Sequence, residues 1–535
     1  MSPDGMTAPL RQQIKGLDAA SAAARLTWMV LPGPELDDTS RALLERGIGG
    51  VVLFSANITG AAQLMGLTAE LRRCATGPLR IAIDHEGGHV ARIGAPVTRF
   101  PSAMAIGATG SEDLAYAVAR AAGEELASLG IDVNLAPVLD VASDPRNPSV
   151  GARSFGSSPD AVARLGAATV RGYRDAGIAA TAKHFPGHGR TPIDSHVDLP
   201  TVTGGLDELR RSDLPPFRAA FQAEVDLVMA SHVAFEGLTD GLPSTLAAPI
   251  MKDLLRDELG FRGLLVTDAM GMRALAARHA IPEACVRSIA AGADTVMPIE
   301  QQDEVLRALA AAIESGVLPE QRVEEALARI AELDARLTRS GDSRAPRGDG
   351  AMLPDAAHSG LAGLVAQRSL TLVAGADLLP IAPSTSVAVI EFASRRASPV
   401  EELDSVAPTV AAALSAYLPR VREVIVRPGE LAAASRLAAI EAAAAAELVI
   451  LATRDAYVWP DECDLIARIA GSDRPTLLVA LRNPYDLDAL PRTTGAVAAY
   501  ADVPQTLEAL ADALTGRAGW PGSLPIELER MSGLT

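Results

Sequence analysis

The sequence predicts a two-domain α/β protein, in which a (β/α)8 TIM barrel is followed by a smaller three-layer α/β sandwich. Short apolar runs alternate with longer segments of helical periodicity, and this pattern is interrupted once, near residue 340, by a stretch rich in Gly, Ser, Pro and Arg. A chain of 535 residues also exceeds the size of one ordinary core. We therefore assign residues 1–338 to the barrel, 339–358 to a linker and 359–535 to the sandwich.

Eight apolar runs precede the linker, which is the number of strands that a (β/α)8 barrel requires. An open doubly wound sheet is the alternative. It is less favoured because no Gly-rich phosphate loop follows the first run, so the ligand site would be unexplained. The runs cover residues 26–31, 49–54, 79–83, 131–138, 178–182, 227–230, 264–267 and 295–297.

Segments between the runs predict the helices of the barrel, because apolar residues recur in them at three- and four-residue spacing. Ser158 and Pro159 add an N-cap and a proline in the first turn of one such helix. The clearest helical segments cover residues 113–129, 158–176 and 246–259.

Six more apolar runs follow the linker and alternate with Ala-rich helical stretches, which is typical of a second α/β domain. These runs cover residues 370–373, 387–391, 421–426, 448–452, 476–480 and 495–500.

Composition excludes several classes of partner. The formal net charge of −18 argues against nucleic acid and against anionic membranes, because both attract basic surfaces. We find neither a signal-peptide pattern nor an apolar stretch of transmembrane length. The three cysteines lie far apart, and their spacing fits neither a disulfide framework nor a zinc-binding motif. We therefore expect a cytoplasmic protein without a cofactor.

Residues 182–200 are the segment in which we expect the active site to be centred. It holds three of the eight histidines, and its prolines and glycines predict a loop following the run 178–182. Lys183 is one of only three lysines in a chain whose other basic residues are arginines, which indicates that a compact ammonium group is required there. The alternative for Lys183 is chance.

Two further features suggest acid–base and nucleophilic chemistry. Asp268 ends a buried run, where its carboxylate could attack an anomeric carbon, although it could equally cap the next helix. Asp194 and His196 lie two residues apart, so the aspartate can accept from one ring nitrogen and leave the other free for proton transfer. A solvated loop is the alternative for this pair, and a metal site built from His184, His196 and Asp268 is the alternative for the histidines.

Four ordered motifs resemble the signature of glycoside hydrolase family 3, in its β-N-acetylglucosaminidase branch. The first is Lys183 to Gly189 with Asp194, Ser195 and His196. The others are the Asp-His-Glu-Gly-Gly run from Asp84 to Arg92, the Arg-Ser-Phe-Gly run from Arg153, and Val-Thr-Asp ending at Asp268.

The resemblance implies a role for each matched residue. Asp268 would be the nucleophile and His196 the acid/base, oriented by Asp194. The residues that would hold the sugar are Asp84, Arg92, Arg153, Lys183 and His184. His89 stands where the family usually has arginine, and Arg190 stands in a variable place where it could add positive charge near the leaving group.

The resulting hypothesis is a retaining exo-β-N-acetylglucosaminidase that acts on a carbohydrate, with peptidoglycan fragments as the expected source. Besides a metal-dependent hydrolase, two alternatives stay open. A neutral histidine repels phosphate less than a carboxylate would, so the enzyme could be a phosphorylase that releases GlcNAc 1-phosphate. The second alternative is a sugar-binding protein without catalytic turnover, although such a protein would not need Asp194, His196 and Asp268 together.

Overall fold

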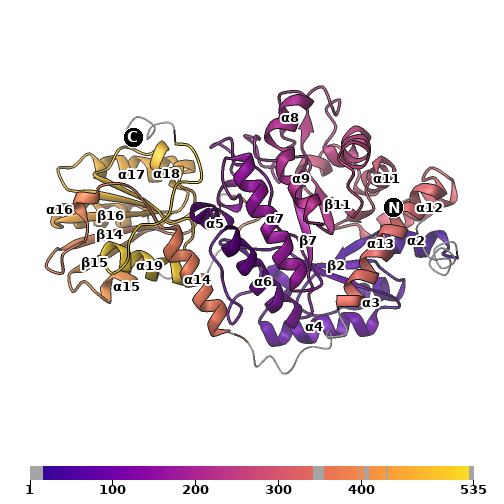
Figure 1. Ribbon diagram of the computed structural model, residues 1–535, viewed down its shortest axis with the longest axis horizontal. Helices are drawn as coiled ribbons and strands as arrows, with labels where there is room; N and C mark the ends of the chain where they lie inside the picture. Colours follow the sequence, from indigo (N-terminus) through magenta and orange to yellow (C-terminus); the bar gives the residue numbers. More distant parts are fainter. Residues whose placement is uncertain are drawn as a thin grey trace.

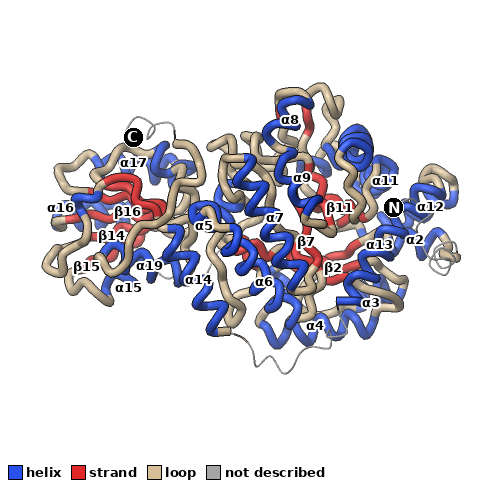
Figure 2. The backbone as a smooth tube through the Cα atoms, in the orientation of Figure 1, coloured by secondary structure: helices blue, strands red, loops and turns tan. Residues whose placement is uncertain are grey.

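The computed structural model describes residues 16–340, 353, 355–396, 398–402, 409–428 and 432–528. Two groups of strands are visible in it, each surrounded by helices (Figure 2). The chain therefore contains two α/β units, as the sequence predicts.

The first unit is a closed barrel of eight parallel strands. A parallel bridge between Thr27 and Val296 joins its first strand to its last. Each predicted apolar run coincides with one strand, so the barrel prediction is confirmed. In sheet order the strands are β1 (Trp28–Val30), β2 (Gly50–Leu53), β3 (Arg80–Ile83), β6 (Val133–Asn134), β7 (Ala179–Phe185), β9 (Leu227–Ala230), β11 (Leu264–Ala269) and β12 (Thr295–Met297).

Helices cover the outside of the barrel (Figure 1). Ser158 caps one of them by accepting a hydrogen bond from the backbone N–H of Ala161, as its sequence predicts. The helix expected at 246–259 is instead a π-helix, η5 (Pro249–Glu258), because apolar spacing of three and four residues does not distinguish the two windings. The other helices are α2 (Ala19–Arg25), α3 (Asp38–Glu45), α4 (Ala61–Cys74), α5 (Ala103–Thr109), α6 (Glu112–Ser128), α7 (Pro159–Asp175), α8 (Leu206–Ser212), α9 (Leu214–Gln222), α10 (Arg273–Ala276), α11 (Ile281–Ala291), α12 (Gln302–Glu314) and α13 (Glu320–Ser340).

A short hairpin of β4 (His85–Gly87) and β5 (Val90–Ala91) follows β3 directly. Its turn needs glycine at Gly88, which has φ of 56°, and a Cβ there would lie 2.8 Å from the Cβ of Ser102. The hairpin returns the chain to the barrel mouth. A second small sheet pairs β8 (Thr201–Val202) with β10 (Ala234–Phe235).

The second unit is a six-stranded sheet between two helical layers (Figure 1). One apolar face packs on α14 (Ala356–Ser369), α15 (Val410–Ser415) and α19 (Pro504–Leu514). The other packs on α16 (Ala432–Ala445) and α17 (Pro460–Ala470), with the short α18 (Asp486–Ala489) nearby. The strands, in sheet order, are β13 (Thr371–Ala374), β18 (Gly495–Ala498), β17 (Thr476–Ala480), β16 (Leu448–Thr453), β14 (Val387–Phe392) and β15 (Val421–Val426), and only the β13–β18 pair is antiparallel.

Most of the expected linker 339–358 lies outside the described residues. On either side of it, α13 ends at Ser340 and α14 begins at Ala356, so the assignment of 356–358 to a linker overlaps the first turn of α14. The exact domain boundaries remain a prediction. Within the described residues, no helix combines the length and the apolar character that a membrane crossing requires.

Candidate active site

One cavity of about 290 Å³ opens at the carboxyl ends of the barrel strands. Side chains from β7, β11 and the segments after β3 and β6 converge there, as the barrel architecture predicts. Seven of the eight site residues named from the sequence line this cavity, and the eighth, Asp194, contacts one of the seven. The seven are Asp84, Arg92, Arg153, Lys183, His184, His196 and Asp268.

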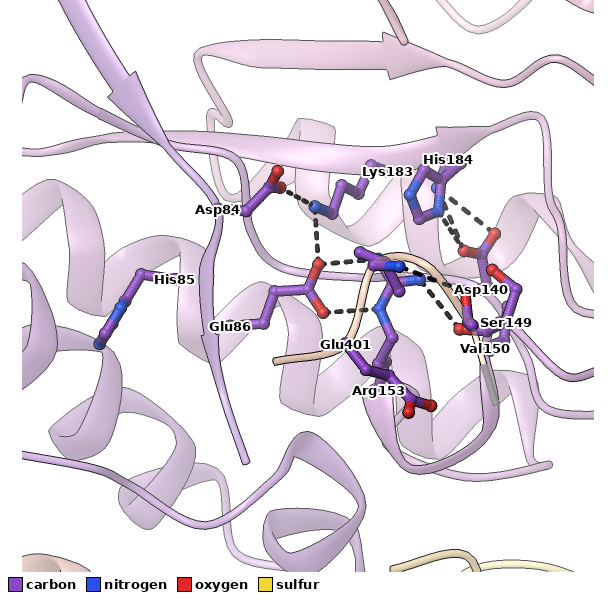
Figure 3. Close-up of polar contacts among 12 residues, drawn as sticks. Asp84, His85, Glu86, Asp140, Ser149, Val150, Arg153, Lys183, His184 and Glu401 are labelled. Carbon is purple, nitrogen blue, oxygen red and sulfur yellow. Dashed lines mark hydrogen bonds and ion pairs between the residues drawn. The ribbon is translucent and has the colours of Figure 1, made fainter. Parts of the chain in front are cut away.

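Four charged side chains form a buried network (Figure 3), and three of them, Asp84, Arg153 and Lys183, line the cavity. The ammonium group of Lys183 lies 2.5 Å from Asp84 Oδ1 and 2.7 Å from Glu86 Oε1. Arg153 donates two hydrogen bonds of 2.8 Å to the carboxylate of Glu86. Two anions and two cations therefore balance one another in a region with little water.

The pKa values within this network follow from those contacts. Burial raises the pKa of Glu86, but Arg153 and Lys183 outweigh burial and hold it well below its usual value. Burial lowers the pKa of Lys183, and the carboxylates of Asp84 and Glu86 more than compensate, so its pKa is raised. Glu86 and Lys183 therefore both carry charge near neutral pH.

His184 is fixed by a carboxylate from the neighbouring strand end. Its Nδ1 lies 2.6 Å from Asp140 Oδ2 (Figure 3). Asp140 also accepts from the backbone N–H of His188 at 2.6 Å. Burial raises the pKa of Asp140, but His184 and His188 lower it further than burial raises it. Because the carboxylate of Asp140 accepts at Nδ1, the proton of the His184 ring lies on Nδ1, and Nε2 stays free to contact a ligand.

Asp194 and His196 lie in the loop that follows β7, and they contact each other as predicted. Asp194 Oδ1 lies 2.7 Å from His196 Nδ1 and also accepts from the backbone N–H of His196 at 2.8 Å. Burial raises the pKa of Asp194, but the hydrogen bonds from His196 and Ser398 hold it well below its usual range. The carboxylate is thus ionised, and the imidazole of His196 faces the cavity.

Asp268 belongs to β11 itself and lines the same cavity. Burial raises the pKa of its carboxyl, but the nearby His184, His232 and His196 together lower it below its ordinary value. The next helix, α10, has Met272 at its N-cap position, so the alternative of Asp268 as a helix cap is wrong. An ionised carboxylate at this position can act as a nucleophile.

The second domain also contributes to the cavity. Arg396, Pro399, Val400, Glu401 and Glu402, from the segment that follows β14, line its wall. The backbone carbonyl of Val400 accepts from Arg92 at 2.7 Å, and the carboxylate of Glu402 pairs with the same guanidinium. The cavity is therefore built by both domains.

The two departures from the family pattern have different surroundings. The backbone carbonyl of His89 accepts from Glu402 N–H at 2.9 Å, and its ring lies 3.9 Å from Glu401. Arg190 pairs with Asp213 at 3.0 Å and with Glu208 at 3.1 Å, and it is absent from the cavity wall. Its charge is therefore neutralised, which does not support the expectation that it acts on the leaving group.

Sequence reasoning missed several residues of the site. Glu86 and Asp140 were given no role, although both follow predicted strands. The cations Lys183 and Arg153 would have indicated that a buried anion lies nearby. Ser398, Arg396 and Glu402 carried no such signal. His358, for which the sequence indicates no role, is partly buried and its ring lies 2.8 Å from the carboxylate of Glu125. Among the residues that the structure describes, no three His, Cys, Asp or Glu side chains are grouped to hold a metal ion.

Comparison with known proteins identifies the family. The model of the glycosyl hydrolase family 3 N-terminal domain matches residues 10–333. The chain is 36% identical over 397 residues to "Beta-hexosaminidase A" of Pseudoalteromonas piscicida, a match that covers 69% of this chain and 65% of that protein, just under two thirds of its length. It is 32% identical to "Beta-N-acetylglucosaminidase/beta-glucosidase" of Cellulomonas fimi, over 90% of this chain and 89% of that one.

A solved structure extends the likeness to both domains. The glycoside hydrolase family 3 β-N-acetylglucosaminidase from Paenibacillus sp. str. FPU-7 is 35% identical and superposes with a TM-score of 0.90. The superposition covers 96% of this chain and 99% of that one. The chain therefore belongs to glycoside hydrolase family 3, in its β-N-acetylglucosaminidase branch.

Proposed function

We propose that this protein is a retaining exo-β-N-acetylglucosaminidase, which removes terminal β-linked GlcNAc through a covalent glycosyl intermediate on Asp268. One observation carries the proposal: an ionised, buried carboxylate and a carboxylate-held imidazole line the same cavity. The names of the relatives from Pseudoalteromonas, Cellulomonas and Paenibacillus support β-linked N-acetylhexosamine as the sugar.

In the first step, a carboxylate oxygen of Asp268 attacks the anomeric carbon, and the bond to the leaving oxygen breaks. Protonated His196 gives that oxygen a proton from Nε2, so the aglycone departs as an alcohol. In the second step, His196 takes a proton from water, whose oxygen attacks the anomeric carbon and releases Asp268. Two displacements at one carbon retain its configuration.

The other predicted residues bind the sugar in this scheme. Asp84 accepts from hydroxyl groups, while Arg92, Lys183 and Arg153 donate to them or hold the acceptors in place. His184, oriented by Asp140, presents its second ring nitrogen to the cavity. None of these roles needs a metal or a cofactor.

Replacement of Asp268 by Asn tests the nucleophile. The variant should lose about a thousandfold or more in kcat/KM on an aryl β-N-acetylglucosaminide, because an amide cannot form the glycosyl ester. Asp253→Asn, at an exposed helical position, is the matched control and should retain the full rate. A near-normal rate for the Asp268 variant would refute the assignment.

Product analysis with and without phosphate separates the three candidate activities. Free GlcNAc, formed first as the β-anomer under both conditions, is the expected result. GlcNAc 1-phosphate would show a phosphorylase, and no release of aglycone would show a binding protein.

We further propose that the terminal GlcNAc comes from peptidoglycan fragments in the cytoplasm. Arg396, whose side chain is 52% exposed at the cavity wall, can pair with the lactyl carboxylate of a muramic acid aglycone. The three free thiols fit a reducing compartment. The proposal requires a higher kcat/KM on a GlcNAc–muramic acid disaccharide than on chitobiose, and recovery of the activity in the cytoplasmic fraction of cells. Equal values, or activity outside that fraction, would contradict it.

A further inference from the structure

Asp194 divides its two carboxylate oxygens between two partners. Oδ1 serves His196, through both the backbone N–H and Nδ1. Oδ2 accepts a 2.6 Å hydrogen bond from the hydroxyl of Ser398, a residue of the second domain that lies 204 positions further along the chain. Both side chains are buried, with Ser398 only 1% exposed.

Ser398 is itself held in a fixed position. It lies in the segment that follows β14, and its backbone carbonyl accepts from Glu401 N–H at 3.2 Å. The adjoining Pro399 and Val400 line the cavity, and Val400 also holds Arg92. The hydroxyl is thus presented to Asp194 by a segment that forms one wall of the site.

Resting on the proposed role of His196 as the acid/base, we propose that Ser398 is a positioning residue that completes an Asp194–His196 proton-transfer unit across the domain interface. With one carboxylate oxygen fixed by Ser398, the other is directed at Nδ1, and the imidazole keeps Nε2 toward the cavity. Without this hydroxyl, a buried carboxylate oxygen loses its partner and can turn away from the imidazole.

The consequence is that the second domain controls proton transfer, although Asp194, His196 and Asp268 all belong to the barrel. Loss of Ser398 should therefore impair the protonation of the leaving group more than the attack by Asp268. This selectivity distinguishes a positioning role from a purely structural one.

The test compares two aryl β-N-acetylglucosaminides, one with a 2,4-dinitrophenyl group, which departs without a proton, and one with a 4-methoxyphenyl group, which needs one. In Ser398→Ala, kcat/KM should fall about tenfold on the methoxyphenyl substrate and by less than about twofold on the dinitrophenyl substrate. The ratio of the two values does not depend on the fraction of folded protein, so partial unfolding does not obscure it. An unchanged ratio would overturn the proposal.

Ser386→Ala is the matched control. Ser386 also donates to a carboxylate, Glu447 Oε2 at 2.9 Å, but it precedes β14 and lies at the opposite end of that strand from Ser398. The control should keep the wild-type ratio, and Ser398→Thr, which retains the hydroxyl, should largely restore it. A control that changes the ratio as much as Ser398→Ala would overturn the proposal.

Asp194→Ala distinguishes failure of this inference from failure of the proposed function. It should change the ratio more strongly than Ser398→Ala, and adding Ser398→Ala to it should have no further effect, because the two residues act through one hydrogen bond. If Asp194→Ala leaves the ratio unchanged, the acid/base assignment itself is wrong. If Asp194→Ala changes the ratio and Ser398→Ala does not, only the role of Ser398 is wrong.

Discussion

Glu86 sets the charge balance of the buried network. It lies between Lys183 and Arg153, and each of these cations makes short contacts with its carboxylate. The narrow ammonium of Lys183 fits between Asp84 and Glu86, whereas Arg153 donates from two guanidinium nitrogens to Glu86 and from the third to the carbonyl of Ser149. This geometry is consistent with the expectation that position 183 requires a compact ammonium group.

Replacement of Glu86 by Gln should both destabilise the fold and weaken sugar binding. Removing the negative charge deprives two buried cations of the carboxylate that pairs with both, and breaking buried ion pairs typically costs about 3–5 kcal/mol. We expect a loss of that order in the free energy of unfolding, measured with urea, together with a raised KM.

Glu112→Gln provides the comparison for this change. Glu112 also lies between two arginines, Arg164 at 3.0 Å and Arg171 at 3.8 Å, but its side chain is 44% exposed. Surface pairs of this kind are worth less than about 1 kcal/mol. A cost for Glu86→Gln no larger than that for Glu112→Gln would show that the buried network is not important for stability.

At the scale of elements, the strand ends of the second sheet carry polar side chains toward the barrel. Asn483 follows β17 and packs against Gly151, where a Cβ would lie 2.4 Å from its Oδ1. Close to it, Asp486 begins α18, is fully buried and accepts from the Tyr457 N–H at 2.9 Å. Burial, with a contribution from Asp455, raises the pKa of Asp486 to about 7.

This raised pKa predicts a pH-dependent stability. Because the folded protein holds the proton on Asp486 more tightly than the unfolded chain does, the protonated carboxyl favours folding at low pH. That contribution is lost as the pH rises through about 7. Relative to the wild type, Asp486→Asn, which cannot ionise, should gain on the order of 2 kcal/mol in free energy of unfolding between about pH 5 and about pH 8, because the folded wild type holds a proton over much of that range that the unfolded chain has already released.

Urea unfolding at the two pH values measures this difference. Asp377→Asn, at an exposed position of the same domain, should show no such pH dependence relative to the wild type. A constant difference between Asp486→Asn and the wild type at both pH values would contradict the prediction.

Elements buried on both faces were the most predictable part of the fold. All 14 apolar runs became strands of the two sheets, and most of these are central parallel strands, which need an apolar side chain at nearly every position. The winding of η5 was not predictable, since its apolar spacing also fits an α-helix. The β4–β5 hairpin was also missed, because it is too short to show a period.

Predictability of the site depended on sequence distance. Asp84, Lys183, His184 and Asp268 lie at or just after predicted strands of one barrel, so its topology alone brings them together. Ser398 reaches Asp194 from another domain, through a segment with no motif of its own. Local patterns contain no information about such a contact, because it depends on how the two domains pack.

At the scale of the whole molecule, the carboxyl ends of the barrel strands and the segment after β14 of the second sheet meet at one cavity. The barrel supplies the reacting groups, and the segment after β14 supplies contacts that fix Asp194 and Arg92. Further contacts maintain the interface, including a 2.6 Å hydrogen bond from the hydroxyl of Ser102 to the carbonyl of Tyr500. The geometry of the site thus depends on the docking of the second domain.

Glu402→Gln tests this dependence through the sugar-binding side of the cavity. The carboxylate of Glu402 and the carbonyl of Val400 orient Arg92, whose guanidinium also lies 3.8 Å from Asp84. Loss of the charge should raise KM about tenfold and change kcat much less, because Arg92 binds the sugar and does not transfer a proton. Glu423→Gln, exposed on β15 of the same domain, should leave both constants unchanged. If Glu402→Gln lowered kcat and left KM unaltered, the second domain would act on the chemical step through Glu402 and not through the placement of Arg92.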